Sequence, residues 1–173
     1  MSTVFWPDRH LSEMAQDTRY GFFGDIDVAV IEAAAIDETG EVLLGCGLGN
    51  IPTYAPRAKK IFIELNEALP QSLMGMHDVY VPADPPYRRE IPIYSPSDRI
   101  GRPTLKIDPS KVVGIVRTNA LDGVKAFTKP DATSELIGAN VVQFLVSEYR
   151  KGRIPKEFLP LQSGVGNVAN AVL

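Results

Sequence analysis

The sequence is poor in the residues that build disulfides and metal sites. Its 173 residues hold one cysteine, Cys46, and two histidines, His10 and His77. A single cysteine excludes an internal disulfide framework and fits a reducing compartment, so a cytoplasmic location is expected. Zinc sites need grouped cysteine or histidine ligands, which this sequence lacks, so no metal is expected. Because free cysteine usually packs as a small apolar side chain, Cys46 is predicted to be a buried thiol rather than a nucleophile.

Strong charge and long apolar runs are also missing. The formal net charge is -3 at pH 7, so no field over the whole molecule attracts nucleic acid or an anionic membrane. No segment reaches the roughly 20 apolar residues that span a bilayer. The first seven residues lack a basic stretch followed by an apolar core, so no signal peptide is expected. The composition indicates a soluble globular protein without a nucleic-acid or membrane partner.

Four apolar segments predict the strands of a sheet. They cover residues 26–36, 41–44, 60–66 and 111–119. The first is apolar nearly throughout, which is typical of a strand buried on both faces in a parallel sheet. A turn that ends in Gly40 predicts antiparallel pairing of the first two strands. Strands mixed with helices predict an α/β fold with a mixed, largely parallel sheet and flanking helices, although the strand order cannot be derived.

Helices are predicted near the start of the chain and after the last strand. Three residues share one face of a short early helix: Leu11, Met14 and Ala15. Apolar residues at spacings of three and four predict a longer amphipathic helix: Ile137, Val141, Phe144, Leu145 and Tyr149. Its predicted start has Thr128 or Lys129 as the cap and Pro130 at the first helical position. Gly152 marks its predicted end.

Two loops invite a functional interpretation. The run Gly45-Cys46-Gly47-Leu48-Gly49-Asn50 fails the dinucleotide pattern, because its third glycine is missing and Pro52 and Pro56 allow only a short helix. Residues 68–109 form a proline-rich excursion that is predicted to cross the surface, with one hairpin near residues 91–94. Loops of this length are usually functional or mobile, so a non-catalytic binding or assembly module stays open.

Several polar residues interrupt or end the predicted strands. Glu32 lies inside an apolar strand, where an unpaired carboxylate is costly. Its predicted role is an ion pair or a bond to backbone N–H groups, with catalysis as the alternative. Ligands meet open α/β sheets at the carboxyl ends of strands, which places Glu64, Asn66 and Glu67 near such an edge. Solvated side chains are the default expectation for these three.

The motif Gly164-Val165-Gly166-Asn167 precedes a segment of small residues that is compatible with a helix. It follows the short extended run Leu159-Pro160-Leu161. Glycine lets the backbone approach a ligand closely, and the first turn of a helix leaves N–H groups unpaired. The motif therefore suits a loop that offers main-chain donors to a negative oxygen. From spacing alone, a plain tight turn is the alternative.

Six segments resemble, in order, the acetyl-CoA hydrolase/transferase family, and within it most nearly the succinyl-CoA:acetate (or propionate) CoA-transferases. The resemblance runs from about residue 20 to the end. The segments are Val30-Ile31-Glu32-Ala33, Ile61-Phe62-Ile63-Glu64-Leu65-Asn66-Glu67, Gly75-Met76-His77-Asp78, Asp98-Arg99-Ile100-Gly101-Arg102-Pro103, Ile115-Val116-Arg117-Thr118-Asn119 and residues 159–173. Several independent segments in the family's order are more specific than one glycine motif.

The resemblance implies a CoA-transferase-like (NagB/RpiA-like) fold in an enzyme of two α/β domains. Residues 1–173 would be the later portion of an incomplete N-terminal CoA-transferase domain, with the C-terminal domain absent. The implied substrates are an acyl-CoA (acetyl-, succinyl- or propionyl-CoA) and a small carboxylate. Coenzyme A enters as a thioester, and no cofactor is expected to be bound permanently. The implied partners are the remainder of a parent chain and, as an open question, a second copy in a homodimer.

The resemblance also implies the chemistry. A family glutamate attacks the thioester and becomes a glutamyl-CoA thioester, and backbone N–H groups stabilise the oxyanion. The matching donor is the N–H of Val165, with Gly164, Gly166 and Asn167 in a substrate- and CoA-binding role. The glutamate lies beyond this chain, and none of the following residues matches it: Glu13, Glu32, Glu64, Glu67, Glu90, Glu135, Glu148 and Glu157. The chain alone is therefore expected to be inactive, and acetyl-CoA hydrolysis is the alternative activity.

Overall fold

The computed structural model describes residues 8–123, 128–158 and 161–173. The chain forms two compact units, Met1–Leu121 and Asp122–Leu173. The predicted extended run before the glycine motif falls partly on residues 159–160, outside the described residues. Within the described ranges, no helix combines the length and apolar character needed to cross a bilayer.

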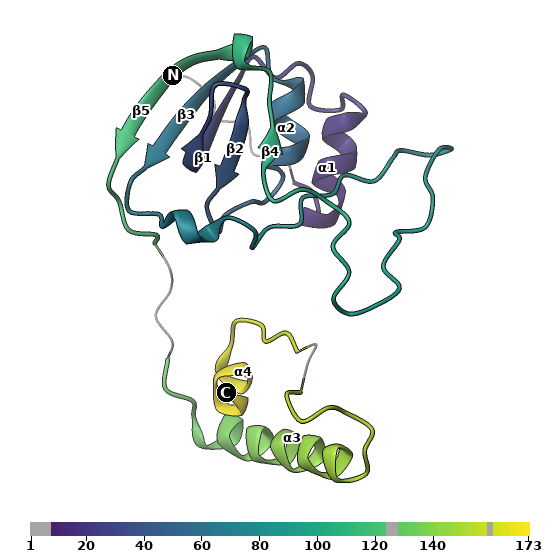
Figure 1. Cartoon of the computed structure of the whole chain (residues 1–173). Coiled ribbons are helices and arrows are strands. Elements are labelled where there is room, and N and C mark those ends of the chain that lie inside the picture. Colours follow the sequence, from purple (N-terminus) through teal and green to yellow (C-terminus); the bar gives the residue numbers. More distant parts are fainter. Residues whose placement is uncertain (1–7, 124–127, 159–160) are drawn as a thin grey trace. The chain divides into compact units, whose positions relative to one another are not determined.

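The first unit contains a five-stranded mixed sheet in the order β4-β2-β1-β3-β5 (Figure 1). The strands are β1 (Val28–Ile36), β2 (Glu41–Leu44), β3 (Lys60–Asn66), β4 (Leu105–Lys106) and β5 (Val112–Thr118). The strands β1, β3 and β5 are parallel, and β2 pairs antiparallel with both β1 and β4. The predicted α/β class, the four strands and the first antiparallel pairing are confirmed. The strand β4 was not predicted, because two residues carry no periodic signal.

One face of this sheet carries the main apolar core. Ile31 and Ile63 are buried there and are neighbours on β1 and β3, with Ala55 of the helix α2 packed against them. The helices on this side are α1 (Leu11–Arg19) and α2 (Ile51–Arg57), which contact each other. The first was predicted, whereas for the second the sequence analysis allowed only a short helix. The helix α2 is short because its prolines are tolerated only near helix ends.

The opposite face of the sheet is covered only in part within the first unit. The short 3-10 helix η1 (Gln71–Leu73) packs Leu73 against Ala34 and Leu43. Farther along this face, Val30 is 70% exposed. The prediction that the first strand is buried on both faces is therefore wrong within this unit, because no helix in the described part of the unit covers the Val30 side.

The proline-rich excursion is closed at its base and otherwise irregular. Val79 and Arg102 form an isolated antiparallel bridge, with N–H···O distances of 2.8 and 3.0 Å. The carboxylate of Asp78 accepts the Gly101 N–H at 2.6 Å. The predicted hairpin at residues 91–94 is absent, since these residues lie in no strand or bridge. Prolines on both sides of this segment limit the N–H donors that a ladder requires.

The second unit consists of α3 (Ala132–Arg150) and α4 (Asn167–Val172) with their flanking loops (Figure 1). The two helices approach closely at Gly138, where a methyl group would lie 2.7 Å from the carbonyl oxygen of Ala171. The helix α3 ends before Gly152, as predicted. The predicted apolar stripe is present in sequence but largely uncovered in this unit, since Phe144 is 63% exposed.

The start of α3 differs from the prediction. Its N-cap is Asp131, whose Oδ1 accepts the Ser134 N–H at 2.8 Å. A cap at Thr128 or Lys129 was expected, with Pro130 as the first helical residue. The carboxylate of Asp131 satisfies a backbone donor three residues ahead, which is the strongest local cap available. Pro130 therefore precedes the helix instead of opening it.

Candidate functional site

The 164–167 loop leads directly into α4 and contains Val165, whose N–H is the candidate donor. Gly166 is the N-cap of α4, and its φ of 154° is a conformation that residues with a side chain rarely adopt. The Gly166 carbonyl accepts the Asn170 N–H at 2.9 Å. Val165 is 96% exposed, and among the described residues its N–H makes no hydrogen bond. The Val165 amide is thus outside any sheet ladder and can reach a ligand.

The two glycines of the loop are not equivalent. Gly164 has no positive φ, and among the described residues a methyl group there would meet no atom within 4 Å. Nothing in the described part of the second unit thus requires glycine at position 164. Gly166, by contrast, requires glycine through its backbone conformation. The predicted ligand-binding role of Gly164 and Gly166 stays a prediction.

Asn167 contacts the beginning of α3. Its Oδ1 accepts a hydrogen bond from Thr128 Oγ1 at 2.9 Å, and its Nδ2 donates to Asp131 Oδ2 at 3.4 Å. The neighbouring Asn170 donates from Nδ2 to the Thr128 carbonyl at 3.2 Å. The pKa of Asp131 is lowered first by the Ser134 N–H, and the Asn167 amide adds in the same direction. Direct substrate or CoA binding by Asn167 stays a prediction, and the contacts in the structure are internal.

In the first unit, two carboxylates face the same side of the sheet at neighbouring positions. Glu32 on β1 and Glu64 on β3 are directly paired in register. Glu32 Oε1 accepts a hydrogen bond from Asn66 Nδ2 at 2.7 Å, and Glu64 Oε1 accepts one from Thr118 Oγ1 at 2.9 Å. The predicted partner of Glu32 was a cation or a backbone N–H. The prediction is wrong in kind, because a neutral side-chain amide fills this role.

The burial of Asn66 differs most from its sequence-based prediction. It is 1% exposed, whereas a solvated side chain was expected. Besides its bond to Glu32, its Nδ2 donates to the Ala120 carbonyl at 2.8 Å, and its Oδ1 accepts the N–H groups of Ala68 and Ala120 at 3.1 and 3.2 Å. Its position at a strand end was the only signal in the sequence. By contrast, Glu67 is half exposed, as expected.

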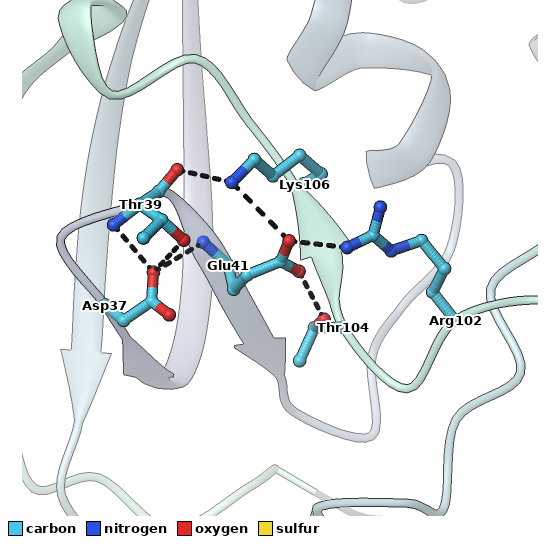
Figure 2. Close-up of polar contacts among 6 residues, drawn as sticks. All are labelled: Asp37, Thr39, Glu41, Arg102, Thr104 and Lys106. Carbon is cyan, nitrogen blue, oxygen red and sulfur yellow. Dashed lines mark hydrogen bonds and ion pairs between the residues drawn. The ribbon is translucent and has the colours of Figure 1, made fainter.

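A second polar cluster surrounds Glu41 at the start of β2 (Figure 2). Its Oε1 lies 2.5 Å from an Arg102 guanidinium nitrogen and 3.5 Å from Lys106 Nζ, and its Oε2 accepts from Thr104 Oγ1 at 2.5 Å. The Thr104 hydroxyl is the main cause of a lowered pKa of Glu41, and the two cations act in the same direction. These bonds fasten the end of the excursion to β2, and no sequence pattern predicted them.

The turn before β2 is held by a carboxylate as well. Asp37 Oδ1 accepts the N–H groups of Thr39 and Glu41 at 2.9 and 3.0 Å and the Thr39 hydroxyl at 2.8 Å (Figure 2). The pKa of Asp37 is lowered, chiefly by the Glu41 N–H. Such a local Asp turn is a structural feature. All of the donors to Asp37 are used within the turn, so this cluster positions the hairpin.

Cys46 is exposed, so the prediction of a small buried thiol is wrong. It lies on the loop after β2, between two glycines that offer no side chain to cover it. His77 Nε2 lies 3.1 Å from the Leu44 carbonyl oxygen and takes part in chain packing. Across residues 8–123, 128–158 and 161–173, no three His, Cys, Asp or Glu side chains form a group that could hold a metal ion.

Comparison with solved structures defines the class of fold. The described arrangement resembles the crystal structure of a 4-hydroxybutyrate CoA-transferase from Porphyromonas gingivalis, with a TM-score of 0.53. The match covers 94% of this chain and 31% of that one, at 23% sequence identity. The fold is thus that of part of a CoA-transferase. The likeness concerns the fold alone.

Sequence comparison then gives the family. The family model of the acetyl-CoA hydrolase/transferase N-terminal domain matches residues 2–117. The chain belongs to the acetyl-CoA hydrolase/transferase family, which confirms the resemblance described above and extends it toward the first residue. The 164–167 loop lies beyond the part that this model matches.

Individual relatives extend the match over nearly the whole chain. The chain is 49% identical over 170 residues to the propanoyl-CoA:succinate CoA transferase of Escherichia coli, covering 98% of this chain and 35% of that protein. It is 42% identical to the succinyl-CoA:acetate CoA-transferase of Clostridium kluyveri (99% and 32% covered). It is 44% identical to an acetyl-CoA hydrolase of Yarrowia lipolytica (96% and 33% covered). The chain spans about a third of the length of these curated relatives.

Proposed function

We propose that this chain is part of a CoA-transferase that moves CoA between an acyl-CoA and a small carboxylate, with the Val165 N–H as an oxyanion donor. Family membership and the names of the E. coli and C. kluyveri relatives support the reaction class. The single observation that carries the role of Val165 is that this exposed residue has an N–H without a hydrogen bond among the described residues. The next residue, Gly166, has a conformation that only glycine adopts readily. That geometry suits a donor that must meet a developing negative charge.

The proposed chemistry has two linked exchanges. A glutamate carboxylate from outside this chain attacks the thioester carbonyl, and the carbonyl oxygen becomes an oxyanion that accepts the Val165 N–H. The carbon–sulfur bond then breaks, which releases the CoA thiolate and leaves an acyl-glutamyl anhydride. The thiolate attacks the glutamyl carbonyl and expels the product carboxylate, giving a glutamyl-CoA thioester. The acceptor carboxylate runs these steps in reverse. Coenzyme A is substrate throughout, with no permanently bound cofactor.

Acetyl-CoA hydrolysis is the second candidate, because the relative from Y. lipolytica carries that name. Water would then replace the acceptor carboxylate, while the oxyanion would need the same donor. Strict dependence of CoA-thioester consumption on added carboxylate would favour transfer, and consumption without any carboxylate would favour hydrolysis. The chain alone is proposed to be inactive, and turnover of acetyl-CoA by the isolated 173-residue chain would contradict that.

A chimera tests the proposal directly. The segment of the E. coli transferase that matches this chain is replaced by the 173 residues, and exchange between acyl-CoA and carboxylate is measured. Val165→Pro removes the N–H, and its expected effect is a loss of kcat of about a hundredfold or more. Val165→Ala is the matched control, because it changes the side chain and keeps the donor. A folded chimera without activity, or a Val165→Pro variant with unchanged kcat, would contradict the proposed role.

A further inference from the structure

We propose that Asn167 and Asp131 act as a positioning pair that fixes the 164–167 loop by fastening α4 to the start of α3. The proposal rests on the function proposed for Val165 and assigns Asn167 a different task from substrate contact. It also gives Asp131 a role in the site, which no motif in the sequence suggested. Both residues act through the backbone conformation of the loop.

The helix α4 cannot hold its own position. It has six residues, and helices this short are marginal without packing partners. The structure provides an attachment at each end. Asn167, the first residue of α4, bonds to Asp131 and Thr128, and near the other end Ala171 packs directly on Gly138. The direction of α4 in this unit is therefore set by α3.

The attachment at Asn167 lies next to the functional loop. Only Gly166 separates Asn167 from Val165. Gly166 has an unusual φ, and because it is glycine it can move to other backbone conformations at little energetic cost. Because Gly166 is flexible, the backbone at Val165 has a fixed orientation only if the residue after Gly166 is held in place. The two bonds of Asn167 hold that residue, because one side-chain oxygen accepts from Thr128 and one nitrogen donates to Asp131. The Val165 N–H is then presented from a fixed backbone.

Asp131 has two tasks that can be separated by substitution. Its Oδ1 caps α3 through the Ser134 N–H, and its Oδ2 receives the Asn167 amide. Asp131→Ser keeps a good N-cap but shortens the side chain, so the link to Asn167 is lost while α3 keeps its start. Asn167→Ala removes the same link from the other side and also removes the bond from Thr128. Asn140→Ala is the matched control, since Asn140 is exposed on α3 and makes no side-chain hydrogen bond among the described residues.

The experiment uses the chimera for kinetics and the 173-residue chain for backbone order. A positioning role predicts that Asn167→Ala lowers kcat about tenfold and changes KM for the acyl-CoA less than about twofold, because orientation in the transition state is lost rather than ground-state binding. Asp131→Ser should give a loss in the same direction that is no larger, because the Thr128 bond to Asn167 stays. The double variant should be no worse than Asn167→Ala, since that exchange already breaks the Asn167–Asp131 link. Asn140→Ala should leave kcat unchanged.

Backbone order gives a readout that does not depend on activity. In the isolated chain, the heteronuclear 15N NOE of Val165 and Gly166 should fall in Asn167→Ala and Asp131→Ser and stay unchanged in Asn140→Ala. The positioning role would be overturned by any of three results: a rise in KM with constant kcat, losses in kcat that multiply in the double variant, or unchanged loop order. Val165→Pro separates the two proposals: if it is harmless while loop order still responds to Asn167→Ala, the oxyanion role fails and the pair stands.

Discussion

Replacing Asn66 by alanine should strongly lower the free energy of unfolding of the first unit. Asn66 ends β3 and uses both of its polar atoms. It donates to Glu32 and to the Ala120 carbonyl, and it accepts two backbone N–H groups, from Ala68 and Ala120. It thereby joins three segments that lie far apart in sequence.

The size of the effect follows from these four bonds. Each hydrogen bond contributes about 0.5–1.5 kcal/mol net, and a buried group left without a partner costs more. Ala120 is exposed and can bond to water instead, which lowers the cost at that end. Glu32 has neither a cation nor a second hydrogen-bond donor among the described residues, so in Asn66→Ala its carboxylate loses its partner. Together these terms predict a loss of roughly 3 kcal/mol in the free energy of unfolding.

Urea unfolding of the 173-residue chain, followed by circular dichroism, measures this loss. Asn119→Ala is the matched control, because Asn119 is exposed, lies one residue before Ala120 and makes no side-chain hydrogen bond in the described part of the chain. Exposed substitutions of that kind usually change stability by less than about 0.5 kcal/mol. Hydrogen exchange of the Ala120 amide should also accelerate in Asn66→Ala. Equal stability of the two variants would refute the argument.

Two further predictions concern the Glu41 cluster and the packing of α4. The pKa of Glu41 is lowered by Thr104 and by the neighbouring cations, so its contribution to stability is present above the ordinary carboxyl pKa and is lost as pH falls through the lowered one. The free energy of unfolding, measured with urea at a series of pH values, should therefore fall more steeply toward acid pH in the wild type than in Glu41→Gln. Parallel curves would contradict this. Gly138→Val should separate α4 from α3, because its side chain would enter the space of the Ala171 carbonyl at 2.7 Å. Hydrogen exchange of the Asn170 amide should then rise, and unchanged protection would show that the contact is not needed.

Periodic apolar patterns predicted the elements of this protein well. The second and third predicted strands coincide with β2 and β3, and the fourth differs from β5 by one residue at each end. Such segments are predictable because alternation and apolar content are local properties of the chain. The predicted end of α3 before Gly152 is correct for the same reason, since a glycine with positive φ terminates helices in a recognisable way.

Features that depend on contacts between distant segments were not predictable. The partner of Glu32 lies 34 positions away in sequence, and the partners of Glu41 lie more than 60 positions away. The prediction for Cys46 was wrong for a different reason. A general preference of cysteine for burial was applied to a loop where no neighbouring side chain covers it. The candidate loop was recognised from its glycine spacing and from family resemblance, and its supporting contacts appeared only in the structure.

The two asparagines Asn66 and Asn167 solve the same physical problem in different units. Each places its amide nitrogen on a carboxylate, Glu32 in one case and Asp131 in the other, while its oxygen accepts from a backbone N–H or a hydroxyl. A carboxylate can stay charged beside such an amide without a nearby cation, because the amide donates to it and carries no charge of its own. Aspartate at either position would remove the donor and add a like charge. The exchanges Asn66→Asp and Asn167→Asp should therefore cost more stability at neutral pH than the matching alanine variants, which remove the donor without adding a charge. Equal losses in urea unfolding would contradict this.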